Sequence, residues 1–187
     1  MKSFSLHAFS TPGISLPFKI EGTIAREAQV LRIHYSLIGP LTELEIEAPG
    51  IVQERQDKLW EKTCFEFFLG PRGSAQYWEF NLSPNGNWNA YHFQEYRKGM
   101  QQEPAFSSLP FQFRRESSEV QLELKVDLNF IIPPEQALEV GISAILKFAK
   151  KSAFSSPSNK SGETFWALVH PGKEPDFHRR DSYVVEL

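Results

Sequence analysis

Hydrophobic and polar residues alternate along most of the chain, and a period of two predicts β-strands. In EVQLELKVDL, residues 119–128, valine and leucine alternate with glutamine, glutamate and lysine. Successive side chains of a strand point to opposite faces of a sheet, so this segment is predicted to be half buried. The same alternation, or a short apolar run, predicts further strands at 18–25, 30–37, 42–48, 63–70, 76–83, 88–93, 111–116, 138–150, 164–170 and 182–187.

Turn-forming residues separate these segments at intervals of roughly 8–15 residues, a spacing typical of all-β proteins. The predicted fold is therefore an antiparallel two-sheet β-sandwich of the jelly-roll kind. One or two short helices are expected, at 53–62 and at 133–138, where a proline stands in the first turn. Residues 150–163 are polar and serine-rich, which predicts a loop. The sequence shows neither an internal repeat nor a linker, so residues 1–187 are predicted to form one domain.

The charge and the distribution of apolar residues narrow the class of partner. The net charge is −3 and no run of Lys or Arg exceeds two, so neither nucleic acid nor an anionic membrane is an expected partner. No apolar run approaches the ~20 residues that span a bilayer. Prolines and a glycine interrupt residues 1–18, which is not typical of a signal peptide. Cys64 is the only cysteine, so no disulfide can form within the chain, and we expect a cytoplasmic protein.

The segment QYWEFNLSPNGNWNAYHF, residues 76–93, is rich in aromatic rings and amides on both sides of one Pro-Asn-Gly turn. Alternation predicts that one face of its first strand is core, with Trp78, Phe80 and Leu82. The other face carries a ring, a carboxylate and an amide, from Tyr77, Glu79 and Asn81. A tight hairpin would bring Asn89 and Tyr91 beside them, whereas a slip of one residue would reverse the faces.

Two charged residues interrupt apolar strands, and each allows more than one interpretation. Glu66 stands within TCFEFFLG, and carboxylates are rarely buried without a partner. It lies at the rim of the sheet or pairs with a basic residue, or else it contacts a ligand. Lys147 interrupts the apolar run of 138–150 and could neutralise Glu66 or Glu79 or donate to a ligand hydroxyl.

Other polar residues were considered for metal binding or catalysis. His92, His170, Asp176 and His178 do not show the spacing of a zinc site, so hydrogen bonds to the backbone are the favoured interpretation for these histidines. No Ser/His/Asp or Cys/His motif is present, and Cys64 on an apolar strand is expected to be a small core residue. We therefore predict no metal site and no catalytic residue.

Three segments carry a resemblance to a known family: DKLWEKTCFEFFLG (57–70), YWEFNLSPNGNWNAY (77–91) and FWALVHPGKEPDFH (165–178). Together they resemble a DOMON-like domain of the group related to family 9 carbohydrate-binding modules, from about residue 15 onward. The resemblance implies a β-sandwich with a ligand site on one concave sheet face. In the carbohydrate-binding relatives, two tryptophan rings sandwich a terminal sugar and polar side chains bind its hydroxyls.

The resemblance also implies roles for particular residues. By position in the motifs, Trp60 and Trp166 match the two rings, Glu66 matches the acidic residue, and Glu79 or Asn81 matches a polar residue of the sheet. DOMON relatives that bind haem use a methionine and a histidine as axial ligands. The two methionines here, Met1 and Met100, lack the expected strand context, so we expect no haem and no other cofactor. A structural calcium ion stays an open alternative, although no dense Asp/Asn loop is present.

These observations lead to one favoured function and two alternatives. A pyranose has apolar faces and a hydroxyl rim, so its site needs aromatic rings and a few fixed polar groups. We predict a non-catalytic protein that binds a saccharide, a glycoconjugate or a related small polar ligand. The alternatives are a module that binds a protein partner and no small ligand, and a glycosidase-like enzyme that uses Glu66 and Glu79. The predicted ligand-binding residues are Trp60, Glu66, Tyr77, Glu79, Asn81, Asn89, Tyr91, Lys147 and Trp166.

Overall fold

The computed structural model describes residues 1–9, 16–152, 154 and 162–187, and most of the predicted loop at 150–163 lies outside the described residues. The strands are β1 (Lys2–Ala8), β2 (Lys19–Glu27), β3 (Val30–Ile38), β4 (Cys64–Pro71), β5 (Tyr77–Leu82), β6 (Trp88–Phe93), β7 (Gln101–Gln102), β8 (Phe111–Arg115), β9 (Glu119–Asp127), β10 (Leu138–Lys147), β11 (Glu163–Ala167) and β12 (Val185–Glu186). Short 3₁₀ helices are η1 (Leu41–Glu43), η2 (Leu59–Glu61) and η3 (Arg180–Ser182).

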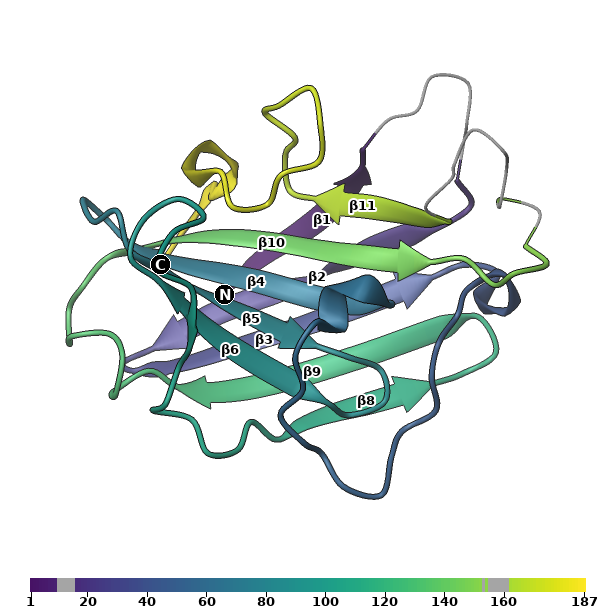
Figure 1. Cartoon of the computed structure of the whole chain (residues 1–187), viewed down its shortest axis with the longest axis horizontal. Coiled ribbons are helices and arrows are strands. Elements are labelled where there is room, and N and C mark those ends of the chain that lie inside the picture. Colours follow the sequence, from purple (N-terminus) through teal and green to yellow (C-terminus); the bar gives the residue numbers. More distant parts are fainter. Residues whose placement is uncertain (10–15, 153, 155–161) are drawn as a thin grey trace.

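The named strands form one antiparallel sheet. Its order is β7-β6-β5-β4-β10-β11-β1-β2-β3-β9-β8, and β12 pairs with β10. The sheet is strongly curled, so that β4, β5, β6 and β10 lie in front of β2, β3, β8 and β9 (Figure 1). The all-β antiparallel class is confirmed. Two separate sheets are not confirmed, because β1 pairs with β2 along most of its length and with β11 at its end, and so joins the two halves.

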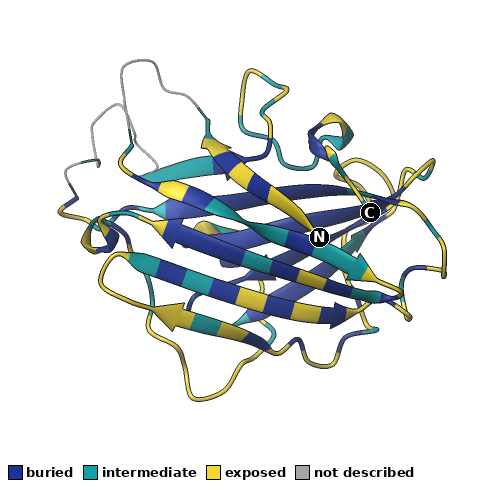
Figure 2. Cartoon of the chain, turned by 180° about the vertical axis from the view of Figure 1, so that it is seen from behind, coloured by how far each residue is buried: buried dark blue, intermediate teal, exposed yellow. Residues whose placement is uncertain are grey.

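The main hydrophobic core lies between the two halves of the curled sheet. Tyr35 of β3 contacts Phe65 of β4 with 5.3 Å between ring centroids, and its hydroxyl donates to the Glu66 carbonyl at 2.8 Å. Seen from behind, β3 and β9 alternate between buried and exposed residues (Figure 2). The outer face of this half meets solvent and carries the polar residues of β3 and β9. This arrangement agrees with the alternation of polar and apolar residues in the sequence.

The other half of the sheet is buried on both faces. Every residue of β4 and β5 is buried. Their inner face contacts the main core, and their outer face is covered by loops and by the C-terminal segment. A second hydrophobic cluster lies there, formed by Phe68, Tyr77, Tyr91, Phe93 and Tyr183, with Trp60 and Phe177 packed against it. This second cluster surrounds the candidate site.

Three predicted elements differ from the structure. Residues 42–48 form no strand, and only Leu44 makes an isolated bridge, with Phe148. The helix expected at 53–62 is limited to η2, and no helix forms at 133–138. Both helical segments contain a residue with left-handed backbone, Lys58 at φ 61° and Glu135 at φ 64°. A left-handed residue cannot continue a right-handed helix, so each predicted helix is interrupted.

The strand β1 was not predicted from the sequence. Its burial pattern alternates, with Phe4 and Leu6 facing the core, but these two apolar positions are too few to give a clear periodic signal. Its place is set by long-range pairing with β2 and β11. Local sequence carries no direct information on such pairing.

Candidate ligand-binding site

A cavity of about 340 Å³ lies on the outer face of the front half of the sheet. This volume is at the lower end of the range for small-molecule sites. Strand residues line it as Glu66, Phe68, Glu79, Phe93, Ile145 and Phe165. The lining is completed by Trp60 of η2 and by the loop residues Arg97, Met100, Pro175, Phe177 and His178. The cavity is thus a mainly apolar pocket with a few charged or polar side chains, built from distant parts of the chain.

Strand register explains why the two acidic side chains meet on this face. Glu66 on β4 is opposite Asn81 on β5 and Ser143 on β10, and Glu79 is opposite Phe68. Residues directly opposite each other on paired strands point to the same face, and successive residues alternate between faces, so Glu66 and Glu79 both point outward. The main core contains those residues of 77–82 that were predicted to face it. The predicted division of this strand into a core face and a polar face is therefore confirmed.

Glu66 is a buried carboxyl group with an incomplete set of hydrogen bonds. It is 2% exposed. Ser143 Oγ donates to its Oε2 at 3.3 Å, while Oε1 has no hydrogen-bond partner among the described residues. Burial raises the pKa of Glu66 well above its ordinary value, and the nearby Glu79 carboxyl adds to this effect. These two effects favour the protonated, neutral form of Glu66.

Glu79 is also buried, at 4% exposure. Asn81 Nδ2 donates to its Oε1 at 2.7 Å, which holds the carboxyl in one orientation. Burial raises the pKa of Glu79 to about 7, against the opposing effects of the Asn81 hydrogen bond and the Arg97 charge. Two acids in one small cavity thus have pKa values displaced in the same direction, which is typical of functional sites.

His178 contributes the third titratable group of the cavity. Its Nε2 lies 3.9 Å from Glu79 Oε2, and its Nδ1 shares a hydrogen bond of 2.8 Å with the Tyr77 hydroxyl. Burial, with a contribution from Arg97, lowers the pKa of His178 to about 4. The imidazole is therefore neutral at pH 7 and does not balance the charge of Glu79. Tyr77 in turn stacks on Phe93, with 4.7 Å between ring centroids, and so packs against a residue that lines the cavity.

Arg97 is the basic residue that lines the cavity, and its charge is already paired. Its guanidinium donates to Asp176 Oδ1 at 2.9 Å. Tyr96 also donates through its hydroxyl to the Asp176 carboxylate. These contacts tie the loop that carries Arg97 to the C-terminal loop that carries Phe177 and His178. They close one side of the cavity.

Asn89 and Tyr91 lie beside the cavity rather than in its lining. Strand pairing sets Asn89 opposite Asn81 and Tyr91 opposite Glu79, so the expected hairpin register is confirmed. Tyr91 donates through its hydroxyl to Asp57 Oδ1 at 2.8 Å, and Asn89 Nδ2 donates to the same oxygen at 3.0 Å. The Tyr91 ring is 5.8 Å from the Trp60 ring. This network holds the loop that presents Trp60.

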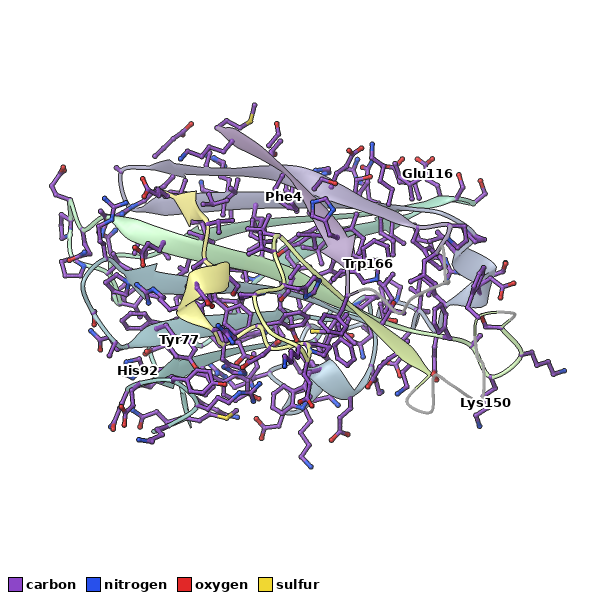
Figure 3. The ribbon with its side chains drawn as sticks, turned by 90° about the horizontal axis from the view of Figure 1, so that it is seen from above. Phe4, Tyr77, His92, Glu116, Lys150 and Trp166 are labelled. Atoms are coloured by element: carbon purple, nitrogen blue, oxygen red, sulfur yellow. The ribbon has the colours of Figure 1, made fainter. Side chains whose placement is uncertain are left out.

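Two further predicted residues have other surroundings. Lys147 lies on the same face of β10 as Ile145, but its Nζ is 3.0 Å from Glu163 Oε2. Trp166 is in the main core, where its Nε1 donates to Thr164 Oγ1 at 2.9 Å. Figure 3 shows Trp166 nearer the middle of the molecule than Tyr77. Because neighbouring strand residues point to opposite faces, Phe165 rather than Trp166 lines the cavity.

Sequence reasoning missed most of the loop residues of this site. Arg97, Met100, Phe177 and His178 come from loops, whose positions no periodicity predicts. His178 was considered only as a metal ligand or a backbone-bonded histidine. The signal available was composition, because an aromatic residue and a histidine follow a proline turn in PDFH, residues 175–178.

Met100 and His178 also bear on the question of haem, since both line the cavity. An axial histidine must aim one ring nitrogen at the iron. Here Nδ1 of His178 is bonded to Tyr77 and Nε2 faces the Glu79 carboxyl, so the histidine does not fit that role. In the part of the chain that the structure describes, no group of three or more His, Cys, Asp or Glu side chains is arranged to hold a metal ion.

The fold has a solved relative. No protein-family model and no curated protein sequence matches the chain. The structure is similar to a candidate carbohydrate-binding protein from Bacteroides uniformis, with a TM-score of 0.70 at 12% identity, over 98% of this chain and 84% of that one. At this identity the likeness shows a shared all-β fold and no more.

Two weaker likenesses are to structures of family 9 carbohydrate-binding modules. A family 9 carbohydrate-binding module from Caldicellulosiruptor kristjanssonii in complex with glucose gives a TM-score of 0.48 at 7% identity, covering 83% of this chain and 69% of that one. The same module with cellotriose gives 0.46 at 7% identity, with 83% and 68% covered. Among the described residues, no helix is both long enough and apolar enough to cross a membrane.

Proposed function

We propose that this protein binds a saccharide in the cavity and does so without catalysis. The observation that carries the proposal is the joint lining of one cavity of about 340 Å³ by aromatic rings and two buried carboxyl groups. Trp60, Phe165 and Phe177 offer apolar surfaces for the faces of a sugar ring. Glu66, Glu79 and His178 offer groups that bind hydroxyls. A buried polar group left unpaired costs about 1–3 kcal/mol, so a polyol that pairs Glu66 gains affinity and selectivity.

The contact set differs in part from the one predicted. Trp60, Glu66 and Glu79 remain proposed ligand contacts, while Tyr77, Asn81, Asn89 and Tyr91 are proposed to position them. The second stacking ring is proposed to be Phe165 or Phe177 in place of Trp166. A DOMON-like ancestry remains part of this proposal and rests on the sequence motifs.

Titration with sugars tests the proposed function. Glucose and cellotriose are added separately while tryptophan fluorescence and heat of binding are followed. Binding should change the emission of Trp60, and Trp60→Ala should abolish both signals. Phe130→Ala, at an exposed position remote from the cavity, is the control that should keep them. A broad panel of mono- and disaccharides without any binding would refute the proposal.

Glycoside hydrolysis is a second candidate because one carboxyl, Glu79, has a pKa near 7 beside another buried acid. A glycosidase pairs an acid of raised pKa with a second carboxylate. If the protein is a glycosidase, it should slowly release product from an aryl glycoside. Glu79→Gln should abolish that release. Saturable binding of a sugar without hydrolysis would contradict the glycosidase function and support binding alone.

A further inference from the structure

Among the described residues, the buried acid Glu66 has no positively charged partner. Its Oε1 accepts no hydrogen bond from the described residues although the side chain lines the cavity. Two basic side chains on this face of the sheet pair with other acids, Arg97 with Asp176 and Lys147 with Glu163. An ionised carboxylate in such a place is costly unless a cation or several donors reach it.

The remaining titratable groups do not supply a positive charge either. Burial keeps His178 neutral at pH 7, since its pKa is lowered to about 4. The other groups around the two carboxyls are a thiol and phenols that are neutral when protonated, and burial raises the pKa of each. They are Cys64 on β4, Tyr35 on β3, Tyr77 on β5, Tyr91 on β6 and Tyr183 near the C-terminus. With the Arg97–Asp176 ion pair counted as neutral, ionisation of Glu66 or Glu79 therefore gives the surroundings of the cavity a negative charge.

The aromatic rings that line the cavity also favour a positively charged ligand. Trp60, Phe68, Phe93, Phe165 and Phe177 surround the acids. The face of an aromatic ring attracts a cation, and the attraction is strongest where water is excluded. Aromatic rings together with buried carboxyls form the chemical setting in which an ammonium group is bound.

We propose that the preferred ligand is a sugar with a free ammonium group, an amino sugar, and that Glu66 Oε1 accepts a hydrogen bond from that ammonium. The inference rests on the proposed saccharide function and makes it more specific. An N-acetylated sugar carries no charge and gives Glu66 no cation. A sugar acid would bring a further negative charge to the cavity. A neutral sugar can occupy the cavity but supplies no cation to Glu66.

The test compares three ligands of the same ring structure. Glucosamine, glucose and N-acetylglucosamine are titrated calorimetrically into the full chain at pH 7. Glucosamine is expected to bind about tenfold tighter than glucose, the factor that corresponds to about 1.4 kcal/mol. Its cation lowers the pKa of Glu66, so binding should release protons. Repeating the titration in buffers of different ionisation enthalpy measures that release.

Two variants assign the effect to Glu66. Glu66→Gln retains the shape of the protonated side chain and should reduce the ratio of the glucosamine affinity to the glucose affinity to near unity. Glu123→Gln removes an exposed carboxylate from β9, on the other half of the sheet, and should behave as the wild type. Thermal melting checks that both variants are folded, and the three-ligand comparison in the wild type decides the ligand class without any variant.

Each outcome has a separate meaning. Equal affinity for glucose and glucosamine overturns the inference and leaves the saccharide function in place. A preference for glucosamine that survives in Glu66→Gln overturns the assignment of Glu66. Failure of all three sugars, followed by failure of the broader panel, overturns the inference and the saccharide function together.

Discussion

Neutralising Glu79 is expected to stabilise the protein at neutral and alkaline pH. The folded chain buries this carboxyl and raises its pKa from 4.5 to about 7. In Glu79→Gln, the amide oxygen can still accept the hydrogen bond that Asn81 Nδ2 now donates at 2.7 Å. The substitution therefore removes the titration and keeps the local contact.

The sign and size of the effect follow from proton linkage. Below pH 4.5 both the folded and unfolded chains hold the Glu79 proton, so the group has no effect on stability. Between pH 4.5 and about 7 the unfolded chain ionises Glu79 while the folded chain keeps the proton, so the free energy of unfolding falls as pH rises. The loss is complete above about pH 7 and amounts to about 3 kcal/mol, at about 1.4 kcal/mol per pKa unit.

Urea unfolding between about pH 5 and pH 8 measures this effect, with tryptophan fluorescence as the signal. The free energy of unfolding of Glu79→Gln should exceed that of the wild type by a small amount at the acidic end and by about 3 kcal/mol at the alkaline end. Glu123→Gln, at an exposed position, is the control and should follow the wild type. A difference between Glu79→Gln and wild type that does not change with pH would refute the reasoning.

Two other substitutions test how the C-terminal segment packs on the sheet. A Cβ at Gly70 would overlap the Arg180 guanidinium, which is the flexible end of a side chain, so Gly70→Ala should displace it from Glu139, cost about 1 kcal/mol and increase hydrogen exchange in residues 175–183. Unchanged exchange in that segment would contradict the contact. Tyr77→Phe removes the hydroxyl that is 2.8 Å from His178 Nδ1 and should cost about 1 kcal/mol. The His178 ring signals in an NMR spectrum should shift, and unshifted signals would count against this hydrogen bond.

Alternation in the sequence was sufficient to place the polar face of the central hairpin. Tyr77, Glu79 and Asn81 lie on the outer face, and β6 pairs with them in the expected register. The reason is local, because a two-residue period and a Pro-Asn-Gly turn fix both the faces and the hairpin. The same reasoning could not decide whether Glu66 was paired or exposed to a ligand, since that depends on β10 and on distant loops.

For Trp166, the match to the family motif predicted the direction of the side chain less well than strand register does. Its motif position suggested a stacking ring, but pairing of Ile145 with Phe165 turns Phe165 toward the cavity and Trp166 toward the core. The residues of the loop walls, such as Arg97 and His178, were beyond prediction for a different reason. Their places depend on long-range contacts, including the ion pair between Arg97 and Asp176.

The strand β1 also constrains the order in which the molecule can be assembled. His7 pairs with Ala167, so strands far apart in the sequence must meet before the two halves of the sheet are joined. Such high contact order slows folding, because the entropy of closing a long loop is lost before the contact stabilises the chain. The cavity wall around Phe177 and His178 follows β11 in sequence. We therefore expect ligand-binding competence to arise late in folding, together with closure of the sheet.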